Sequence, residues 1–181
     1  MRKYPVGIQS FESLRKEGYL YIDKTELIYR LISTGKYYFL SRPRRFGKSL
    51  LISTIEAYYS GQKELFQGLF IDGTEKNWIS YPILHFDLSA QKYDSAESLY
   101  DILNDILAKW EKKYGTEPSE VSLSLRFQGI IQRAAEKAGK GVVILVDEYD
   151  KPMLQAIGND NLQNTYRDTL KAFYGALKSK D

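Results

Sequence analysis

The chain has 181 residues, of which 43% are hydrophobic, and a formal net charge of +3. Its length fits one domain of ordinary size with ample apolar content for a core. The lack of cysteine excludes a disulfide framework and thiolate chemistry, and it suits a reducing, cytoplasmic setting. No stretch approaches the ~20 apolar residues of a membrane span, so we expect no membrane association. The modest positive charge is weak evidence for a polyanionic partner.

Residues 1–35 read as a lead-in segment with two helices. Ser10 is a suitable cap for a short helix through residue 16. Asp23, followed three residues later by Glu26, has the spacing of a capping box for a second helix, which Gly35 should end. A short aromatic stretch between these helices, residues 19–22, favours extended structure.

The most informative stretch follows, at residues 37–51, with the sequence YYFLSRPRRFGKSLL. The apolar run 37–40 predicts a short buried strand, and residues 41–46 predict a tight loop. Gly47, Lys48 and Ser49 then open a segment with helical spacing. A strand, a loop and a helix opened by Gly-Lys-Ser is the layout of a phosphate-binding P-loop.

Each residue type in this tripeptide suits a polyphosphate. The first amides of a helix have no partner within the helix and lie at the positive end of its dipole. Gly47 lets the backbone approach phosphate oxygens, Lys48 supplies a point charge, and the Ser49 hydroxyl can ligate Mg²⁺. The pattern departs from G-x-x-x-x-G-K-[ST] because Arg42 stands at the position of the first glycine. A polar helix start remains the alternative to a phosphate site.

The rest of the chain alternates strands with helices. Residues 81–88 and 141–146 predict strands, and the second, a β-branched run, predicts a strand buried on both faces of a parallel sheet. Helical apolar spacing covers residues 95–114, 127–138 and 162–177. A connector with one helical turn is expected within residues 61–76. This alternation favours an α/β layered domain with a mainly parallel sheet.

Two carboxylates, Asp147 and Glu148, follow the most apolar of these strands. Ligands of open α/β sheets bind at the carboxyl ends of the strands. There Asp147 could hold Mg²⁺ opposite Ser49, and Glu148 could orient or deprotonate an attacking water. Acids at a solvated strand end are the alternative, but their pairing with an upstream Gly-Lys-Ser favours a nucleotide site.

Three blocks of the chain closely resemble the AAA-ATPase-like domain family: SRPRRFGKS at 41–49, YPILHFDLS at 81–89 and VDEYDKP at 146–152. The resemblance covers nearly the whole chain. It implies a P-loop NTPase three-layer sandwich with a mainly parallel sheet, truncated before the sensor strand. It also implies that Lys48 and Ser49 occupy the Walker A positions. Asp147 matches the Walker B metal carboxylate, and Glu148 matches the catalytic glutamate.

The resemblance and the motif together give an expected set of nucleotide contacts. These are Tyr21, Pro43, Arg44, Arg45, Phe46, Gly47, Lys48, Ser49 and Leu50. Either Tyr21 or Ile22 is expected to pack on the adenine base. Arg44 and Arg45 could touch phosphates or a neighbouring subunit of an oligomer, or they could form a solvated basic loop.

We therefore predict one AAA-ATPase-like domain over residues 1–181, in which residues 36–181 form a partial NTPase core. Family members continue with a strand that carries a polar sensor residue, and many end in a PD-(D/E)XK nuclease-like domain, so the chain resembles an N-terminal fragment.

The predicted function is Mg²⁺-dependent ATP binding, with hydrolysis in the full-length protein and weak or no turnover in this fragment. The alternative is a nucleotide-gated switch for a nucleic acid or protein partner, reached through the region that follows. A degenerate P-loop that binds no nucleotide is the third reading.

Overall fold

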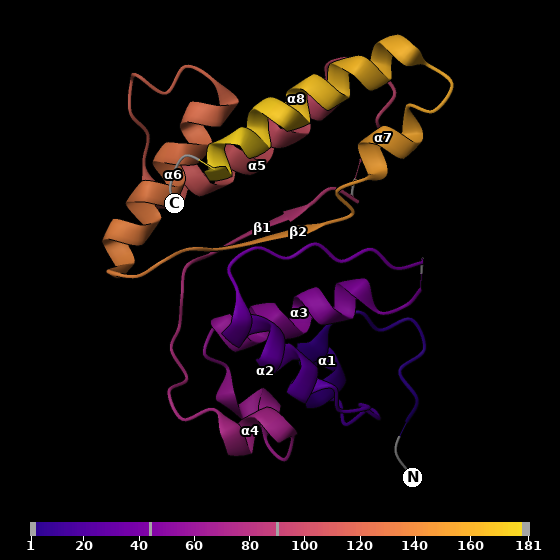
Figure 1. Ribbon diagram of the computed structural model, residues 1–181, viewed down its shortest axis with the longest axis vertical. Coiled ribbons are helices and arrows are strands. Elements are labelled where there is room, and N and C mark those ends of the chain that lie inside the picture. Colours follow the sequence, from indigo (N-terminus) through magenta and orange to yellow (C-terminus); the bar gives the residue numbers. More distant parts are fainter. Residues whose placement is uncertain (1–2, 44, 90, 179–181) are drawn as a thin grey trace. The chain divides into compact units, whose positions relative to one another are not determined.

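The computed structural model describes residues 3–43, 45–89 and 91–178, and the chain folds as two compact units, Met1–Ile83 and Leu84–Asp181 (Figure 1). In the described residues, eight α-helices accompany a parallel two-stranded sheet, which confirms the α/β class. The three-layer sandwich stays a prediction. None of the described helices combines the length and the apolar character needed to cross a bilayer.

The first unit is mainly helical. Its elements are α1 (Phe11–Lys16), α2 (Thr25–Thr34), α3 (Lys48–Tyr59), the 3₁₀ turn η1 (Lys63–Phe66) and α4 (Phe70–Thr74). Ser10 caps α1 as predicted, since its hydroxyl accepts a hydrogen bond from the Ser13 N–H at 3.2 Å. The predicted connector at residues 61–76 contains two short helical elements, η1 and α4, rather than one turn.

Asp23 ties two helices of this unit together. Its carboxylate accepts hydrogen bonds from the Thr25 N–H at 2.8 Å and from the Phe70 N–H at 2.7 Å, at the starts of α2 and α4. Burial opposes ionisation, but a hydrogen bond from the Thr25 hydroxyl at 2.7 Å, together with these two backbone hydrogen bonds, outweighs it and lowers the pKa of the Asp23 carboxyl. The predicted capping box is not formed, because Lys24 occupies the N-cap position and Glu26 pairs with Arg30 at 2.6 Å.

An aromatic cluster holds the first unit together. Phe11 of α1 is fully buried and packs its ring against Phe66 at a centroid distance of 4.9 Å and against Tyr21 at 5.1 Å. Ala57 of α3 and Ile71 of α4 complete the buried set with Leu65. The inward face of α3 is therefore fixed by the elements on both sides of it in sequence, which positions the start of this helix.

The second unit contains both strands, except for the first residue of β1, Ile83, which ends the first unit. Its elements are β1 (Ile83–Asp87), α5 (Ser98–Tyr114), α6 (Leu123–Ala138), β2 (Val143–Asp147), α7 (Lys151–Gln155) and α8 (Asp160–Lys178). β1 pairs with β2, and the Leu88 N–H donates to the Asp147 carbonyl at 3.2 Å. The carboxyl ends of the two strands therefore lie at the same edge of the sheet.

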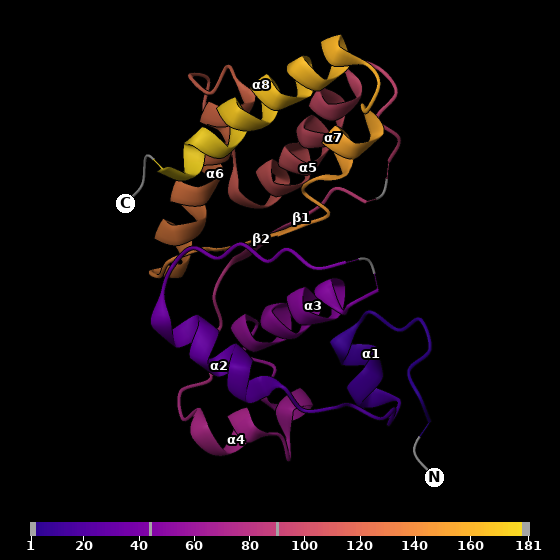
Figure 2. The same ribbon diagram turned by 45° about the vertical axis from the view of Figure 1, so that its right-hand side comes forward.

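Three helices cover one face of this sheet (Figure 2). Phe86 of β1 is 1% exposed, and its ring meets one ring from each helix. The centroid distances are 4.5 Å to Trp110 of α5, 5.1 Å to Phe127 of α6 and 5.3 Å to Phe173 of α8. Alternate residues of a strand point to the same face, so Leu84 and Phe86 are both buried here.

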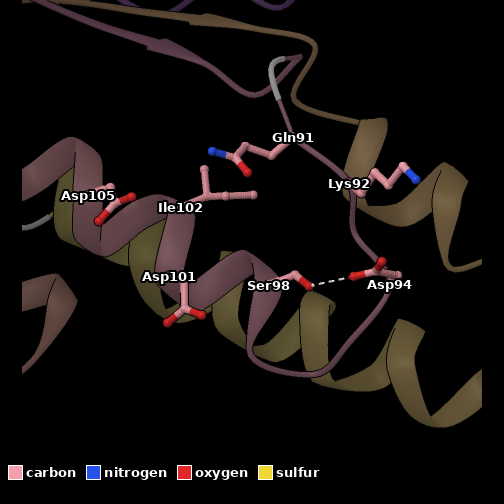
Figure 3. A pocket seen from close by; sticks show the side chains of 7 residues that line it. All are labelled: Gln91, Lys92, Asp94, Ser98, Asp101, Ile102 and Asp105. Carbon is pink, nitrogen blue, oxygen red and sulfur yellow. Dashed lines mark hydrogen bonds between the residues drawn. The ribbon is translucent and has the colours of Figure 1, made fainter.

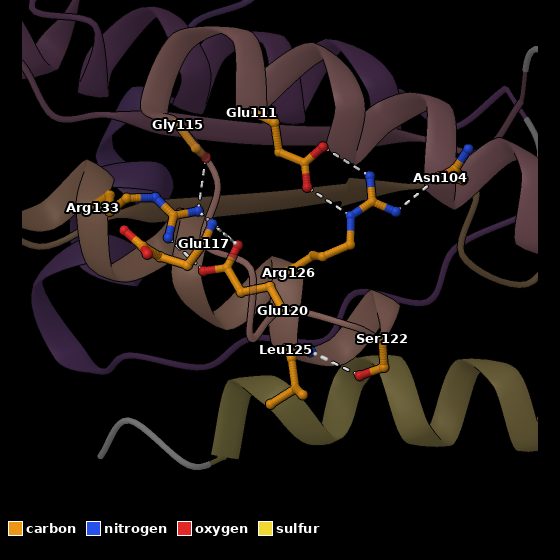
Figure 4. A network of polar contacts seen from close by, with 9 residues as sticks. All are labelled: Asn104, Glu111, Gly115, Glu117, Glu120, Ser122, Leu125, Arg126 and Arg133. Atoms are coloured by element: carbon orange, nitrogen blue, oxygen red, sulfur yellow. Dashed lines mark hydrogen bonds and ion pairs between the residues drawn. The ribbon is translucent and has the colours of Figure 1, made fainter.

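A polar network joins α5 to α6 and to the loop between them (Figure 4). The Arg126 guanidinium donates to both oxygens of Glu111, at 2.6 and 2.9 Å. The Arg133 guanidinium pairs with Glu120, whose side chain is only 9% exposed. A Cβ at Gly129 would overlap the Glu120 carboxylate, so the Glu120 side chain would have to move to admit one.

Two strand predictions differ from the structure. Residues 37–40 form no strand, and Tyr37 and Phe39 are 63% and 72% exposed. A strand exists only by pairing with a neighbour, and an apolar run indicates the tendency without supplying that neighbour. In β2, residues 143–146 are half-buried, so burial on both faces is not observed.

Candidate functional site

The loop before α3 has the backbone shape of an anion site. Arg45 and Gly47 adopt left-handed conformations, with φ of 66° and 75°, and Gly47 is the N-cap of α3. The Leu51 N–H is the first to bond within the helix, to the Gly47 carbonyl at 3.0 Å. The N–H groups of the three preceding residues, 48–50, therefore have no acceptor within the helix and can donate hydrogen bonds to a phosphate.

Lys48 lies over this loop. Its ammonium donates to the Arg42 carbonyl at 3.1 Å, six residues earlier in the chain. This hydrogen bond involves an exposed group, so a phosphate oxygen could replace the carbonyl as the partner of the ammonium. Ser49 is half-buried in the first turn of α3, where its hydroxyl is the oxygen donor closest in sequence to Lys48.

The unit that carries this loop is basic. Met1–Ile83 contains 13 Lys and Arg against 8 Asp and Glu, a formal net charge of +5, whereas Leu84–Asp181 contains 13 against 15, a net charge of −2. The overall charge of +3 hides this difference. A basic surface favours the approach of a polyanion such as a nucleotide triphosphate.

The acidic half of the predicted site lies at the end of β2. Asp147 is the last residue of the strand and is 9% exposed, and its Oδ1 accepts a hydrogen bond from the Glu148 N–H at 2.9 Å. Glu148 itself is left-handed, with φ of 52°, a conformation that non-glycine residues rarely adopt. Such conformations cost energy and cluster at functional sites, so the backbone of Glu148 independently singles out this residue.

Contacts from the loop after β1 hold this turn in place. The Lys151 ammonium donates to the Ser89 carbonyl. The Tyr93 N–H donates to Gln155 Oε1 at 2.9 Å, and the Tyr93 hydroxyl donates to the Leu88 carbonyl at 2.9 Å. The turn that carries Glu148 is therefore braced from the neighbouring strand end, which limits the positions that the carboxylates can take.

Sequence reasoning missed these bracing residues. They join positions 62 residues apart, and neither Lys151 nor Tyr93 belongs to a motif that predicts such a contact. Only the paired strands bring their segments together.

The remaining predicted contact residues differ in exposure. Tyr21 is half-buried against Phe11, and burial raises the pKa of its hydroxyl, whereas Ile22 is 72% exposed. Ile22 is thus the more available of the two residues predicted to pack on adenine. Pro43 and Phe46 are exposed, Leu50 packs against the aromatic cluster, and Arg44 lies outside the described residues.

A surface hollow in the second unit has the wrong charge for a nucleotide. It encloses about 460 Å³ beside the start of α5 and is lined by Asp94, Asp101 and Asp105 with a single cation, Lys92 (Figure 3). Three carboxylates against one ammonium repel a polyphosphate. The loop before α3 is therefore the better phosphate site in the described part of the chain.

The oxygen donors of the predicted site suit Mg²⁺ only together with a nucleotide. Within residues 3–43, 45–89 and 91–178, no group of three or more His, Asp or Glu side chains could hold a metal ion. Mg²⁺ commonly binds through one or two protein oxygens plus substrate phosphates and water. The Ser49 hydroxyl and the Asp147 carboxylate have the hard-oxygen chemistry that this mode of binding needs.

Comparison with known proteins identifies a family and a relative of similar sequence. The family described as "Predicted AAA-ATPase" matches residues 5–181. The relative is the "Uncharacterized protein in vnfD 5'region" of Azotobacter chroococcum mcd 1, which is 35% identical over 181 residues and 99% of this chain. The chain spans about a third, 35%, of the length of that relative. No solved structure matches the chain.

Proposed function

This chain belongs to the AAA-ATPase-like family, and on that premise we propose that it binds Mg²⁺–ATP and hydrolyses the γ-phosphate in the full-length protein. One observation carries the proposal: left-handed Arg45 and Gly47 precede the helical N–H groups of residues 48–50, and the Lys48 ammonium reaches back to the Arg42 carbonyl of the same loop. Backbone N–H groups in such a turn, joined by one ammonium, form a cradle for a phosphate chain.

In the proposed complex, the basic loop binds the phosphates. The Lys48 ammonium exchanges the Arg42 carbonyl for phosphate oxygens and stabilises charge that develops on the transferred group. The N–H groups of residues 48–50 hold the phosphates against the start of α3. Arg45 extends the positive charge of the loop.

The acids after β2 are proposed to act on the same nucleotide. Asp147, fixed by its hydrogen bond from the Glu148 N–H, would hold Mg²⁺ opposite Ser49. Bound Mg²⁺ neutralises charge on the phosphates. Glu148, in its constrained turn, would orient the attacking water and accept its proton.

Paired substitutions test this division of roles. Measure Mg²⁺–ATP affinity by calorimetry and phosphate release under multiple turnover, in the full-length protein, for the wild type, Lys48→Ala and Glu148→Gln. We expect Lys48→Ala to lose binding, and Glu148→Gln to keep binding while losing turnover. Lys63→Ala and Glu136→Gln, exposed residues of η1 and α6, are the matched controls and should resemble the wild type.

Two outcomes would overturn the proposal. Undiminished ATP affinity in Lys48→Ala would remove the loop from the site. Wild-type protein that binds ATP but releases no phosphate would replace hydrolysis with a nucleotide-gated switch, the alternative that the sequence leaves open.

A further inference from the structure

A second cavity lies in the first unit, lined by residues that the nucleotide site does not use. It is open to solvent on one side and has a volume of about 250 Å³, below the ~300–1,000 Å³ of sites for drug-sized ligands. Its size suits one head group of a ligand rather than a whole cofactor. Its lining includes four tyrosines, Tyr29 of α2, Tyr58 and Tyr59 of α3, and Tyr81.

The rings of Tyr58, Tyr59 and Tyr81 pack against one another. The rings of Tyr58 and Tyr59 meet edge to face at a centroid distance of 5.1 Å, and those of Tyr59 and Tyr81 meet edge to face at 5.5 Å. A backbone hydrogen bond from the Tyr81 N–H to the Tyr59 carbonyl, at 2.8 Å, secures the second contact. Three of the four tyrosines that line the cavity thus pack on one another.

Glu75 is the one charged residue among those that line this cavity. Its Oε2 accepts the Tyr58 hydroxyl at 2.5 Å, and its Oε1 accepts the Asn77 N–H at 2.8 Å. Both donors are neutral, so they orient the carboxylate without cancelling its charge. No ion pair to Glu75 occurs among the described residues.

The ionised state of Glu75 follows from these contacts. Burial opposes ionisation, but the hydrogen bonds from Tyr58 and from the backbone of Asn77 outweigh it and lower the pKa of the Glu75 carboxyl. Burial also raises the pKa of the Tyr59 hydroxyl. Burial and the hydrogen bond to Glu75 raise the pKa of the Tyr58 hydroxyl, so both of these phenols are neutral at pH 7. The lining therefore carries a single negative charge set among aromatic rings.

We propose that this cavity, lined by Tyr29, Tyr58, Tyr59, Tyr81 and Glu75, binds the head group of an alkylammonium cation. Aromatic rings attract cations within about 6 Å of their centroids, and methylated ammonium ions are recognised by such aromatic cages. The Glu75 carboxylate supplies the counter-charge, since no cation of the described residues forms an ion pair with it. The cation can come from a free small molecule or from a methylated lysine side chain, since both present the same group.

The test compares choline with its uncharged carbon analogue, in which a quaternary carbon replaces the nitrogen. Both ligands have the same shape, so a difference in affinity reports the charge. Each is titrated into the whole chain and followed by amide NMR shifts. We expect choline to bind about tenfold more tightly, with shifts at Tyr59 and Glu75. A peptide with one trimethyllysine is titrated in parallel, and the tighter of the two cations identifies the source.

Variants separate the charge from the rings. Glu75→Gln keeps an oxygen for the Tyr58 hydroxyl but removes the charge, and Tyr59→Leu removes a ring; each should weaken choline binding about fivefold or more. Tyr59→Phe keeps the ring, and Glu64→Gln changes an exposed carboxylate of η1 outside the lining, so both should bind as the wild type does. Equal binding of choline and its analogue, or no shift with any cation, would overturn the proposal.

Discussion

Substitution of Gly47 by alanine should separate the folding role of this residue from its binding role. Gly47 has φ of 75°, and a Cβ built on it meets no atom within 4 Å. The added methyl therefore costs only the strain of a left-handed L-residue, about 1–2 kcal/mol of unfolding free energy. In the complex, however, the methyl would stand where phosphate oxygens approach the backbone. Loss of one charge-assisted hydrogen bond, about 1.5–3 kcal/mol, would weaken Mg²⁺–ATP binding at least about tenfold.

Gly18→Ala is the matched control for this experiment. Gly18 lies in the same unit, has φ of 72° and also leaves open space around a Cβ, but it follows α1 and is far in sequence from the loop. Urea unfolding should give the same loss of stability in both variants. Calorimetric titration should show weakened Mg²⁺–ATP binding in Gly47→Ala alone. If Gly47→Ala binds ATP as tightly as Gly18→Ala does, the phosphates do not approach this backbone and the reasoning is refuted.

Three further predictions concern the second unit. Gly129→Ala should lower thermal stability, because the methyl displaces Glu120 from Arg133. Gly175 lies in the last turn of α8, where a Cβ meets no atom within 4 Å, so Gly175→Ala should raise the unfolding free energy by up to about 0.5–1 kcal/mol; equal gains in the two variants would contradict this. The hydrogen bond from Arg133 lowers the pKa of Glu120 below 4.5, the ordinary pKa of a glutamate. The ion pair therefore stabilises the fold fully above pH 4.5, and this stability is lost as the pH falls below 4.5. Urea unfolding of the wild type should therefore weaken more steeply below pH 4.5 than that of Glu120→Gln, and parallel pH profiles would argue against the effect. Phe86→Ala should cost about 3–5 kcal/mol by urea unfolding, since its ring contacts three helices, and a loss under 1 kcal/mol would mean that this contact adds little.

Local patterns in the sequence predict most of the helices. Ser10 marks the start of α1, Gly35 the end of α2 and Gly139 the end of α6, because caps depend on residues close in sequence. The apolar spacing of residues 162–177 corresponds to α8, in which Tyr166 and Phe173 are buried. These features need no knowledge of distant parts of the chain.

Features that depend on distant partners could not be predicted in the same way. The run at residues 37–40 has strand character, but no pattern within it supplies a pairing strand, and the structure has irregular chain there. The Tyr93–Gln155 contact and the cavity around Glu75 likewise join residues that are far apart in sequence. For the candidate site, the sequence predicts the contact residues, which remain a prediction, and the structure adds the left-handed backbone of Arg45 and Glu148.

We propose that Asp147 and Lys48 act on one nucleotide. The most direct test measures the ATP affinity of Asp147→Asn with and without Mg²⁺. The asparagine keeps an oxygen for the Glu148 N–H and removes only the charge. We predict that ATP affinity without Mg²⁺ will match the wild type, while the gain in affinity on adding Mg²⁺ will fall about tenfold. An unchanged gain from Mg²⁺ in Asp147→Asn would contradict the claim.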